Sequence, residues 1–197
     1  MGREFSPFEV GARFRVVPPR ASLAESSRID LVMAAGAFGS GEHETTRSCL
    51  ELLQSLPDLE NARVLDFGSG TGILSIAALK LGARNALCVD NDRVAVDTCK
   101  LNCELNGVGE SVEHLCGTLD RVAQDGFDLV LANIYGDILL TAATELLSKA
   151  SPRARLLLSG ILHEDNFDVR RRYRELGCTV VINRMLDEFT TVLLQRG

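Results

Sequence analysis

The chain has 197 residues and a formal net charge of −6, and its length suggests one domain with at most a short extension. Apolar residues make up 46% and charged residues 24%, which excludes disorder, collagen and coiled coil as descriptions of the whole chain. No stretch reaches the roughly 18 apolar residues of a membrane-spanning helix, and the start lacks the apolar segment of a signal peptide. The acidic balance disfavours a large nucleic-acid footprint and permits a basic protein partner.

Residues 1–60 are expected to form an N-terminal section that packs on the main domain. Within it, residues 13–17 read as a short strand that two prolines end. The segment 36–46, GAFGSGEHETT, is a glycine-rich loop suited to act as a lid over a polar ligand. A helix should follow, with Thr45 or Thr46 as its N-cap, and end near residue 56.

Residues 61–197 alternate strands with helical segments of about 10 to 15 residues, a pattern typical of a parallel sheet with helices on both faces. The last two strands are joined too closely for a parallel crossover. We therefore predict a seven-stranded sheet in which only the last strand is reversed. The expected strands are 62–67, 85–90, 111–116, 127–132, 153–159, 179–185 and 189–195. The expected helices are 71–81, 92–106, 137–149 and 163–176.

Six cysteines occur in the chain, none of them in a C-x-x-C pair. Cys99 and Cys103 are one helical turn apart, but no histidine or second cysteine pair stands at zinc spacing along the sequence. Several of the six lie inside apolar runs. We expect buried, reduced thiols of a cytoplasmic protein and no metal site.

Residues 64–72, VLDFGSGTG, place three glycines between a strand and a helix, where open α/β sheets bind ligands. Gly68 and Gly70 let a ligand approach the backbone. The spacing departs from the dinucleotide pattern G-x-G-x-x-G, because the third glycine comes one residue early and Ile73 stands at the expected position. Asp66 ends the strand, and its carboxylate suits a cationic ligand such as S-adenosylmethionine (SAM) better than an anionic pyrophosphate.

Polar residues also follow two neighbouring strands. Asp90 comes 24 residues after the first acid and matches the position whose carboxylate accepts hydrogen bonds from ribose hydroxyls. Asp92 is better suited to cap the next helix. Asn133 and Ile134 directly follow a buried strand. The Asn133 amide can hold the amino-acid part of a ligand or an incoming nucleophile, or it can be a turn residue without a chemical role.

Taken in order along the chain, several segments resemble the ribosomal protein L11 methyltransferases, over roughly residues 5–196. These segments are FGSGEHETT, VLDFGSGTGILSIAALKLGA, VDNDRVAV, ANI and LSGIL. The glycine motif is common to many methyltransferases. Its combination with the loop, ANI and SGIL is typical of a much smaller group of proteins. The resemblance implies a SAM-dependent methyltransferase with a Rossmann-like seven-stranded α/β sheet, in which residues 61–197 bind the methyl donor.

The resemblance also implies roles for individual residues. Four residues would bind SAM, and two more match the shared methyltransferase motif. The four are Thr46, Gly68, Asp90 and Asn133, and the two are Asp66 and Gly70. Apart from the resemblance, our hypothesis for the mechanism is that an acceptor ammonium is desolvated beside a group such as the Asn133 side chain or the Ile134 carbonyl. No general base is obvious, and His43, Glu42 and Asp137 are candidates.

Members of this family carry a separate N-terminal substrate-recognition domain, whereas this chain begins at what resembles the linker, so we expect a catalytic domain without it. Tyr135-Gly136 follows ANI where the family usually has a small apolar pair, and Glu188-Phe189 stands where Glu-Trp is frequent. The expected acceptor is an amino group of a protein such as ribosomal protein L11. A small-molecule acceptor is the alternative, and a non-catalytic SAM-binding module is less favoured. Neither a membrane nor a nucleic acid is expected as partner.

Overall fold

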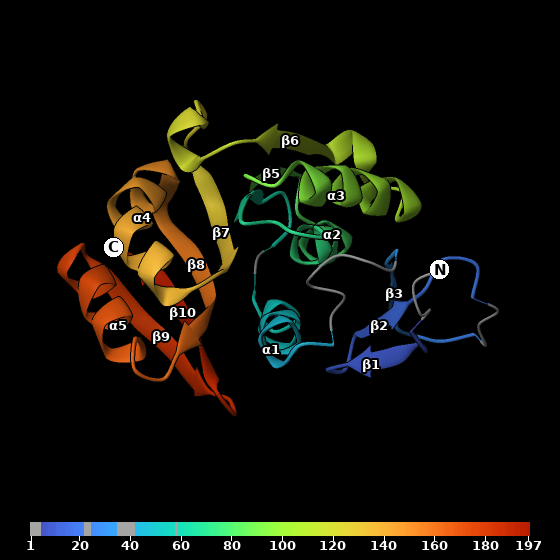
Figure 1. The fold of residues 1–197 in the computed structure, drawn as a ribbon, viewed down its shortest axis with the longest axis horizontal. Coiled ribbons are helices and arrows are strands. Elements are labelled where there is room, and N and C mark those ends of the chain that lie inside the picture. The colour runs from blue at the N-terminus through green and yellow to red at the C-terminus, as the bar shows by residue number, and fades with distance from the viewer. Residues whose placement is uncertain (1–4, 22–24, 35–41, 58) are drawn as a thin grey trace.

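The computed structural model describes residues 5–21, 25–34, 42–57 and 59–197, so the glycine-rich part of the predicted lid loop, residues 36–41, lies outside the described residues. The described chain contains a seven-stranded sheet and a separate three-stranded sheet (Figure 1). None of the described helices is long and apolar enough to cross a membrane.

The main sheet has the strand order β6-β5-β4-β7-β8-β10-β9. Every neighbouring pair is parallel except the two that include β10, which runs antiparallel to both β8 and β9. The prediction of seven strands with only the last one reversed is therefore confirmed. The strands are β4 (Arg63–Phe67), β5 (Asn85–Asp90), β6 (Val112–Cys116), β7 (Phe127–Asn133), β8 (Ala150–Leu162), β9 (Cys178–Met185) and β10 (Phe189–Arg196).

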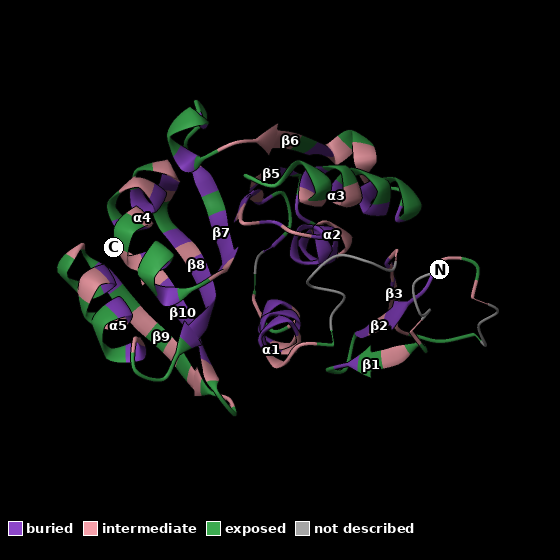
Figure 2. Ribbon diagram, in the orientation of Figure 1, coloured by how far each residue is buried: buried purple, intermediate pink, exposed green. Residues whose placement is uncertain are grey.

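Helices cover both faces of this sheet and bury a separate apolar core on each (Figure 2). One face carries α1 (Glu44–Leu53), α2 (Ile73–Lys80) and α3 (Arg93–Leu105), and the other carries α4 (Gly136–Lys149) and α5 (Asn166–Glu175). Tyr173 of α5 is fully buried in the second core, where its hydroxyl donates to the Leu139 carbonyl oxygen at 3.2 Å. Two short 3-10 turns, Gly109–Ser111 and Leu119–Arg121, flank β6.

The N-terminal section forms more structure than the single strand expected there. β2 (Phe14–Val17) pairs antiparallel with β1 (Phe8–Val10) and parallel with β3 (Ile29–Val32). Asn102 of α3 and Asn106, the C-cap residue of that helix, continue the hydrogen bonding of β3. Asn106 Oδ1 accepts from the Val32 N–H at 2.9 Å, and Asn102 Oδ1 accepts from the Ala34 N–H at 2.9 Å. The small sheet is thus fastened to α3 and shares a core with α1 and α2.

Two helix starts differ from the expectation. Neither Thr45 nor Thr46 caps α1, because His43 is the N-cap residue and its Nδ1 accepts from the Thr45 N–H at 3.4 Å. Both threonines lie inside the helix and are buried, and the helix ends at Leu53 instead of near residue 56. In α2 the left-handed conformation of Gly72, with φ of 77°, delays the start to Ile73. Asp92 caps α3 as predicted, since its side chain accepts from the Val94 N–H.

Candidate active site

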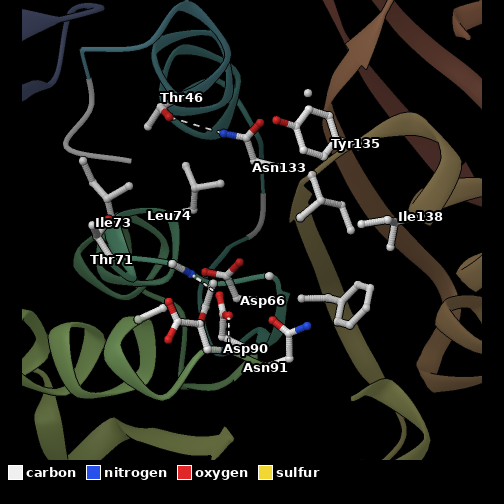
Figure 3. A pocket seen from close by; sticks show the side chains of 18 of the residues that line it. Thr46, Asp66, Thr71, Ile73, Leu74, Asp90, Asn91, Asn133, Tyr135 and Ile138 are labelled. Carbon is white, nitrogen blue, oxygen red and sulfur yellow. Dashed lines mark hydrogen bonds between the residues drawn. The ribbon is translucent and has the colours of Figure 1, made fainter. Parts of the chain in front are cut away.

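A cavity of about 730 Å³ lies at the carboxyl ends of β4, β5 and β7, the edge where parallel sheets bind ligands (Figure 3). The structure brings together in its wall all the residues singled out from the sequence for donor binding and for orienting an acceptor. They are Thr46, Asp66, Gly68, Gly70, Asp90, Asn133 and Ile134.

The glycine loop after β4 is folded back onto β5. The N–H groups of Gly68 and Ser69 both donate to the Val89 carbonyl oxygen, at 2.8 and 3.1 Å. Gly68 has a φ of +72°, and a Cβ there would lie 2.4 Å from Cγ2 of Ile134. Glycine is therefore needed for the turn and for the close approach of the segment after β7.

Asp90 ties this loop to the start of α3. Its Oδ2 accepts from the Gly70 N–H at 2.9 Å, and its Oδ1 accepts from the Asp92 N–H at 3.0 Å (Figure 3). A carboxylate has about four lone-pair sites, so each oxygen can accept a further hydrogen bond. The carboxylate is therefore held in place while it keeps the capacity to accept from ligand hydroxyls.

Asp66 is 2% exposed and accepts a hydrogen bond from the Ser75 hydroxyl at 2.7 Å. Burial raises the pKa of Asp66 from its ordinary value of 3.8 to about 7, although hydrogen bonds from the Ser75 hydroxyl and N–H oppose the rise. The negative charge of Asp90 raises that pKa further. The site thus holds a carboxyl group whose ionisation responds to a positive charge placed beside it.

Asn133 at the end of β7 reaches across to α1, where its Nδ2 donates to Thr46 Oγ1 at 3.3 Å (Figure 3). The Ile134 N–H donates to the Ser159 carbonyl oxygen at 3.0 Å, which holds the segment after β7 against β8. A Cβ at Gly160 would lie 2.7 Å from the Ile134 carbonyl oxygen. Two elements, α1 and β8, therefore fix the position of Asn133 and Ile134.

Of the three candidate bases, only His43 lines the cavity. Its Nδ1 lies 2.8 Å from Thr45 Oγ1, and its ring meets Phe189 edge-on with centroids 5.3 Å apart. Asp137 instead accepts from the Ile138 N–H at the start of α4, and Glu42 is an exposed residue before α1. Because His43 serves as a helix cap and packs on Phe189, its surroundings favour a structural role.

Several lining residues were given no role in the site from the sequence, among them Ser69, Gly160 and Phe189. Ser69 lies within the glycine motif, and its buried Oγ has no hydrogen-bond partner among the described residues. Gly160 lies within the SGIL segment, and Phe189 stands at the position noted for the absence of tryptophan. A hydroxyl residue directly after a strand end, such as Ser69, can be recognised in the sequence as a candidate lining residue. The position of Phe189 at the cavity depends on how its strand pairs, which periodicity alone does not reveal.

Hydrophobic side chains stand at the mouth of the cavity. Tyr135 is 64% exposed, Val94 is 69% exposed and Ile138 is 42% exposed, and all three line the opening. An apolar rim around a polar floor suits a substrate that brings nonpolar surface with it.

Comparisons with known proteins agree with this geometry. The model of the family described as ribosomal protein L11 methyltransferase (PrmA) matches residues 2–196. A ribosomal protein L11 methyltransferase from Chromohalobacter salexigens is 42% identical over 175 residues, covering 88% of this chain and 58% of that protein. One from an Exiguobacterium species is 30% identical over 195 residues, covering 98% of this chain and 62% of that protein. The chain thus spans about three fifths of the length of these curated relatives.

Among solved structures, a ribosomal protein L11 methylase from Lactobacillus delbrueckii subsp. bulgaricus superposes with a TM-score of 0.88 at 23% identity, covering 98% of this chain and 99% of that chain. The magnesium protoporphyrin IX methyltransferase of Synechocystis, solved with bound SAM, superposes with a TM-score of 0.66 at 19% identity, covering 81% and 84%. These two structural similarities support the assignment of the fold. The family match over nearly the whole chain shows that this protein belongs to the ribosomal protein L11 methyltransferase family.

Proposed function

We propose that the protein is a SAM-dependent methyltransferase that methylates amino groups of a protein substrate, as the name of its family states for ribosomal protein L11. One observation carries the proposal: two carboxylates, Asp66 and Asp90, stand at the ends of adjacent strands in one cavity. One carboxylate that accepts hydrogen bonds from ribose hydroxyls, next to a second that faces a positive charge, fits SAM. The same pair of carboxylates does not fit the anionic pyrophosphate of a dinucleotide.

The residues present fit the donor. The Asp90 carboxylate would accept from the ribose hydroxyls, because Gly70 and Asp92 already hold it in position. Asp66 would face the positive charge of the donor, and its raised pKa falls when such a charge is near. The unpartnered Ser69 hydroxyl is a further group that a polar ligand would satisfy.

Asn133 and Ile134 would orient the acceptor. SAM supplies an activated methyl group, so alignment of a neutral nucleophile with the methyl carbon can provide much of the acceleration. The acceptor nitrogen forms a bond to the methyl carbon while the carbon–sulfur bond breaks, and the electron pair of that bond stays on sulfur. The Asn133 side-chain oxygen and the Ile134 carbonyl would accept hydrogen bonds from the amine, whose proton leaves to solvent.

A protein acceptor is supported by the mouth of the cavity. Tyr135, Val94 and Ile138 present apolar surface to the outside, which a side chain inserted from a folded or extended protein would cover. We further propose that residues 1–60 pack as a section on the domain 61–197, and the core shared by α1, α2 and β2 supports this arrangement. Six unbridged thiols support a cytoplasmic location.

The experiment uses SAM labelled on its methyl group with purified protein and, in separate reactions, ribosomal protein L11 and a small-molecule extract. Label on L11 is the expected result, and label confined to the small molecules would overturn the protein acceptor. Asp90→Ala should weaken SAM binding by about 10- to 100-fold, because it removes charge-assisted hydrogen bonds. Asp97→Ala is the matched control, since Asp97 is an exposed acid of α3 paired with Arg93 outside the cavity.

A further inference from the structure

A second cluster of reactive side chains lies behind the donor cavity, between α3 and the edge of the main sheet. Cys88 of β5, Cys99 of α3 and His114 of β6 each bring one ligand-type atom, and these atoms all lie within 4.8 Å of one another. Cys103 stands one helical turn after Cys99 in α3 and is buried like it. The proposed methyl transfer uses none of these four residues.

Packing in an apolar core is enough to explain the presence of the three cysteines, but it does not explain the presence of His114. Cys88, Cys99 and Cys103 are at most 1% exposed, as expected of small apolar residues in a core. His114 Nδ1, however, is buried and has no hydrogen-bond partner among the described residues. A buried polar atom without a partner costs free energy, so such an atom calls for an explanation. An imidazole nitrogen beside thiols has the chemistry of a ligand for a soft or borderline metal ion.

We propose that Cys88, Cys99 and His114 bind a zinc ion, with Cys103 as the fourth ligand of a closed, structural site. Zinc prefers a tetrahedral set of sulfur and nitrogen atoms, and bond lengths of about 2.3 Å to sulfur and 2.1 Å to nitrogen put the ligand atoms roughly 3.5–3.8 Å apart. The ligand atoms of Cys88, Cys99 and His114 need to approach one another by at most roughly 1.3 Å to reach that geometry, and Cys103, which is not within 4.8 Å of all three, needs a further side-chain shift. Zinc displaces the thiol protons to solvent, and no oxidation or reduction is involved.

This site would fasten the elements that build the donor cavity. It joins α3, which carries Asp92 and Val94 at the cavity, to β5, which carries Asp90. Cys99 also lies against the glycine loop, since a Cβ at Gly72 would come within 2.4 Å of its Sγ. Metal binding at this place would therefore stiffen the floor of the cavity without contacting the reactants.

Zinc spacing along the sequence did not predict the site, because the ligands come from three different elements. Cys99 and Cys103 share one face of a helix, while Cys88 and His114 come from adjacent parallel strands at one level, where they are register partners. Only the packing of α3 on β5 and β6 brings Cys99 together with Cys88 and His114, and it leaves Cys103 one helical turn away.

The test measures metal content and stability of the whole chain. Reduced, metal-free protein is loaded with Zn²⁺, freed of excess metal and analysed for zinc, and Co²⁺ is bound in parallel. The expected results are one zinc per chain and the intense visible absorption of tetrahedral, thiolate-bound cobalt. At a hundredfold excess over its Kd, Zn²⁺ should raise the Tm by roughly 5–10 °C, and a chelator should reverse the rise.

Cys99→Ser and His114→Phe should each lose the bound zinc, the cobalt absorption and the rise in Tm. The matched control is Cys178→Ser, which removes a buried cysteine on the other face of the sheet and should keep all three. Because His114 is on an edge strand and only part-buried, its variant stays informative if a core variant fails to fold. Less than a tenth of an equivalent of zinc on the loaded wild-type protein, or equal loss in Cys178→Ser, would overturn the proposal.

Discussion

At the scale of single residues, Asp66 sets the response of the site to pH. Burial raises its pKa to about 7, so the folded, ligand-free protein keeps a proton that the unfolded chain releases near 3.8. The stability gained in this way is fully present below pH 3.8 and is lost as pH rises through about 7. At neutral pH and above, the buried carboxylate therefore destabilises the ligand-free fold, and a cationic ligand offsets that cost.

We accordingly expect SAM to bind more tightly as pH rises from 6 to 8. Below about pH 7 the ligand must displace the proton of Asp66, so the Kd should increase by up to about tenfold per pH unit. Calorimetric titrations in buffers of different ionisation enthalpy measure the affinity and the proton released. Asp66→Asn is the control and should bind weakly with little dependence on pH. A wild-type affinity that stays constant from pH 6 to 8 would contradict the role of Asp66.

A second residue-scale prediction concerns Gly160, which needs both a left-handed backbone and free space. Its φ is +79°, and a Cβ would press on the Ile134 carbonyl oxygen at 2.7 Å. Gly160→Ala should lower the free energy of unfolding by about 2–4 kcal/mol, since the clash adds to the backbone strain. Gly177→Ala has the same kind of strain at φ of +90° with nothing within 4 Å, and it should cost only about 1–2 kcal/mol. Urea unfolding of both variants separates the two contributions, and equal losses would mean that the space beside Ile134 does not matter.

At the scale of secondary-structure elements, one carboxylate joins the start of α1 to the turn between β9 and β10. Glu44 accepts hydrogen bonds from the N–H groups of Asp187, Glu188 and Phe189, at 2.9, 3.2 and 3.3 Å. Desolvation acts to raise the pKa of Glu44, but these three backbone bonds outweigh it, and the net pKa is lowered. The contact therefore stabilises the fold above pH 4.5 and is lost as pH falls below that value.

Glu44→Gln should therefore destabilise the protein by about 1–2 kcal/mol at pH 7, because a neutral amide replaces a charged acceptor of several N–H groups. The difference between variant and wild type should shrink as pH approaches 4. Urea titrations at pH 7, 5 and 4 provide the comparison, with Glu164→Gln as a control on an exposed acid before α5. A difference that does not depend on pH would rule out the charge of Glu44 as its source.

The sequence predicted the main sheet well because its strands are apolar runs bounded by glycine and aspartate, and because each βα unit is local. The motif residues Asp66, Asp90 and Asn133 could be placed at one edge, since the carboxyl ends of parallel strands meet there. The three- and four-residue strands β1 and β3 were missed because so short a pattern has no period, whereas the equally short β2 was found because two prolines mark its end. The cap by His43 and the metal-type cluster around Cys99 were also missed, since they depend on contacts between distant elements.

At the scale of the whole molecule, the asparagines of α3 join the two sheets into one unit. Asn102 is fully buried, accepts from the Ala34 N–H at 2.9 Å and donates to the Thr71 carbonyl oxygen at 2.9 Å. Apolar residues of β2, such as Phe14, share their core with Leu50 of α1 and Ile76 of α2. The small sheet has too little surface of its own to be stable alone, so the two sheets should unfold together.

Asn102→Ala should lower the free energy of unfolding by about 2–3 kcal/mol in a single transition, because it leaves buried backbone groups without these partners. Hydrogen exchange of residues 29–34 and of the main sheet measures whether both parts lose protection by the same amount. Lys100→Ala, an exposed change on the same helix, should leave exchange unaltered. Fast exchange confined to 29–34 would show instead that the small sheet opens by itself.

The positions of the two tyrosines allow folding and ligand binding to be followed by the intrinsic fluorescence of the protein. The chain has no tryptophan, so its near-ultraviolet emission comes from Tyr135 and Tyr173. Tyr173 sits in the core between α4 and α5, while Tyr135 stands at the cavity mouth, 64% exposed. A Tyr135→Phe protein would fluoresce from the core alone and report on unfolding, and a Tyr173→Phe protein would report on whatever enters the cavity. Folding and ligand binding can thus be followed separately in this protein without attaching a dye.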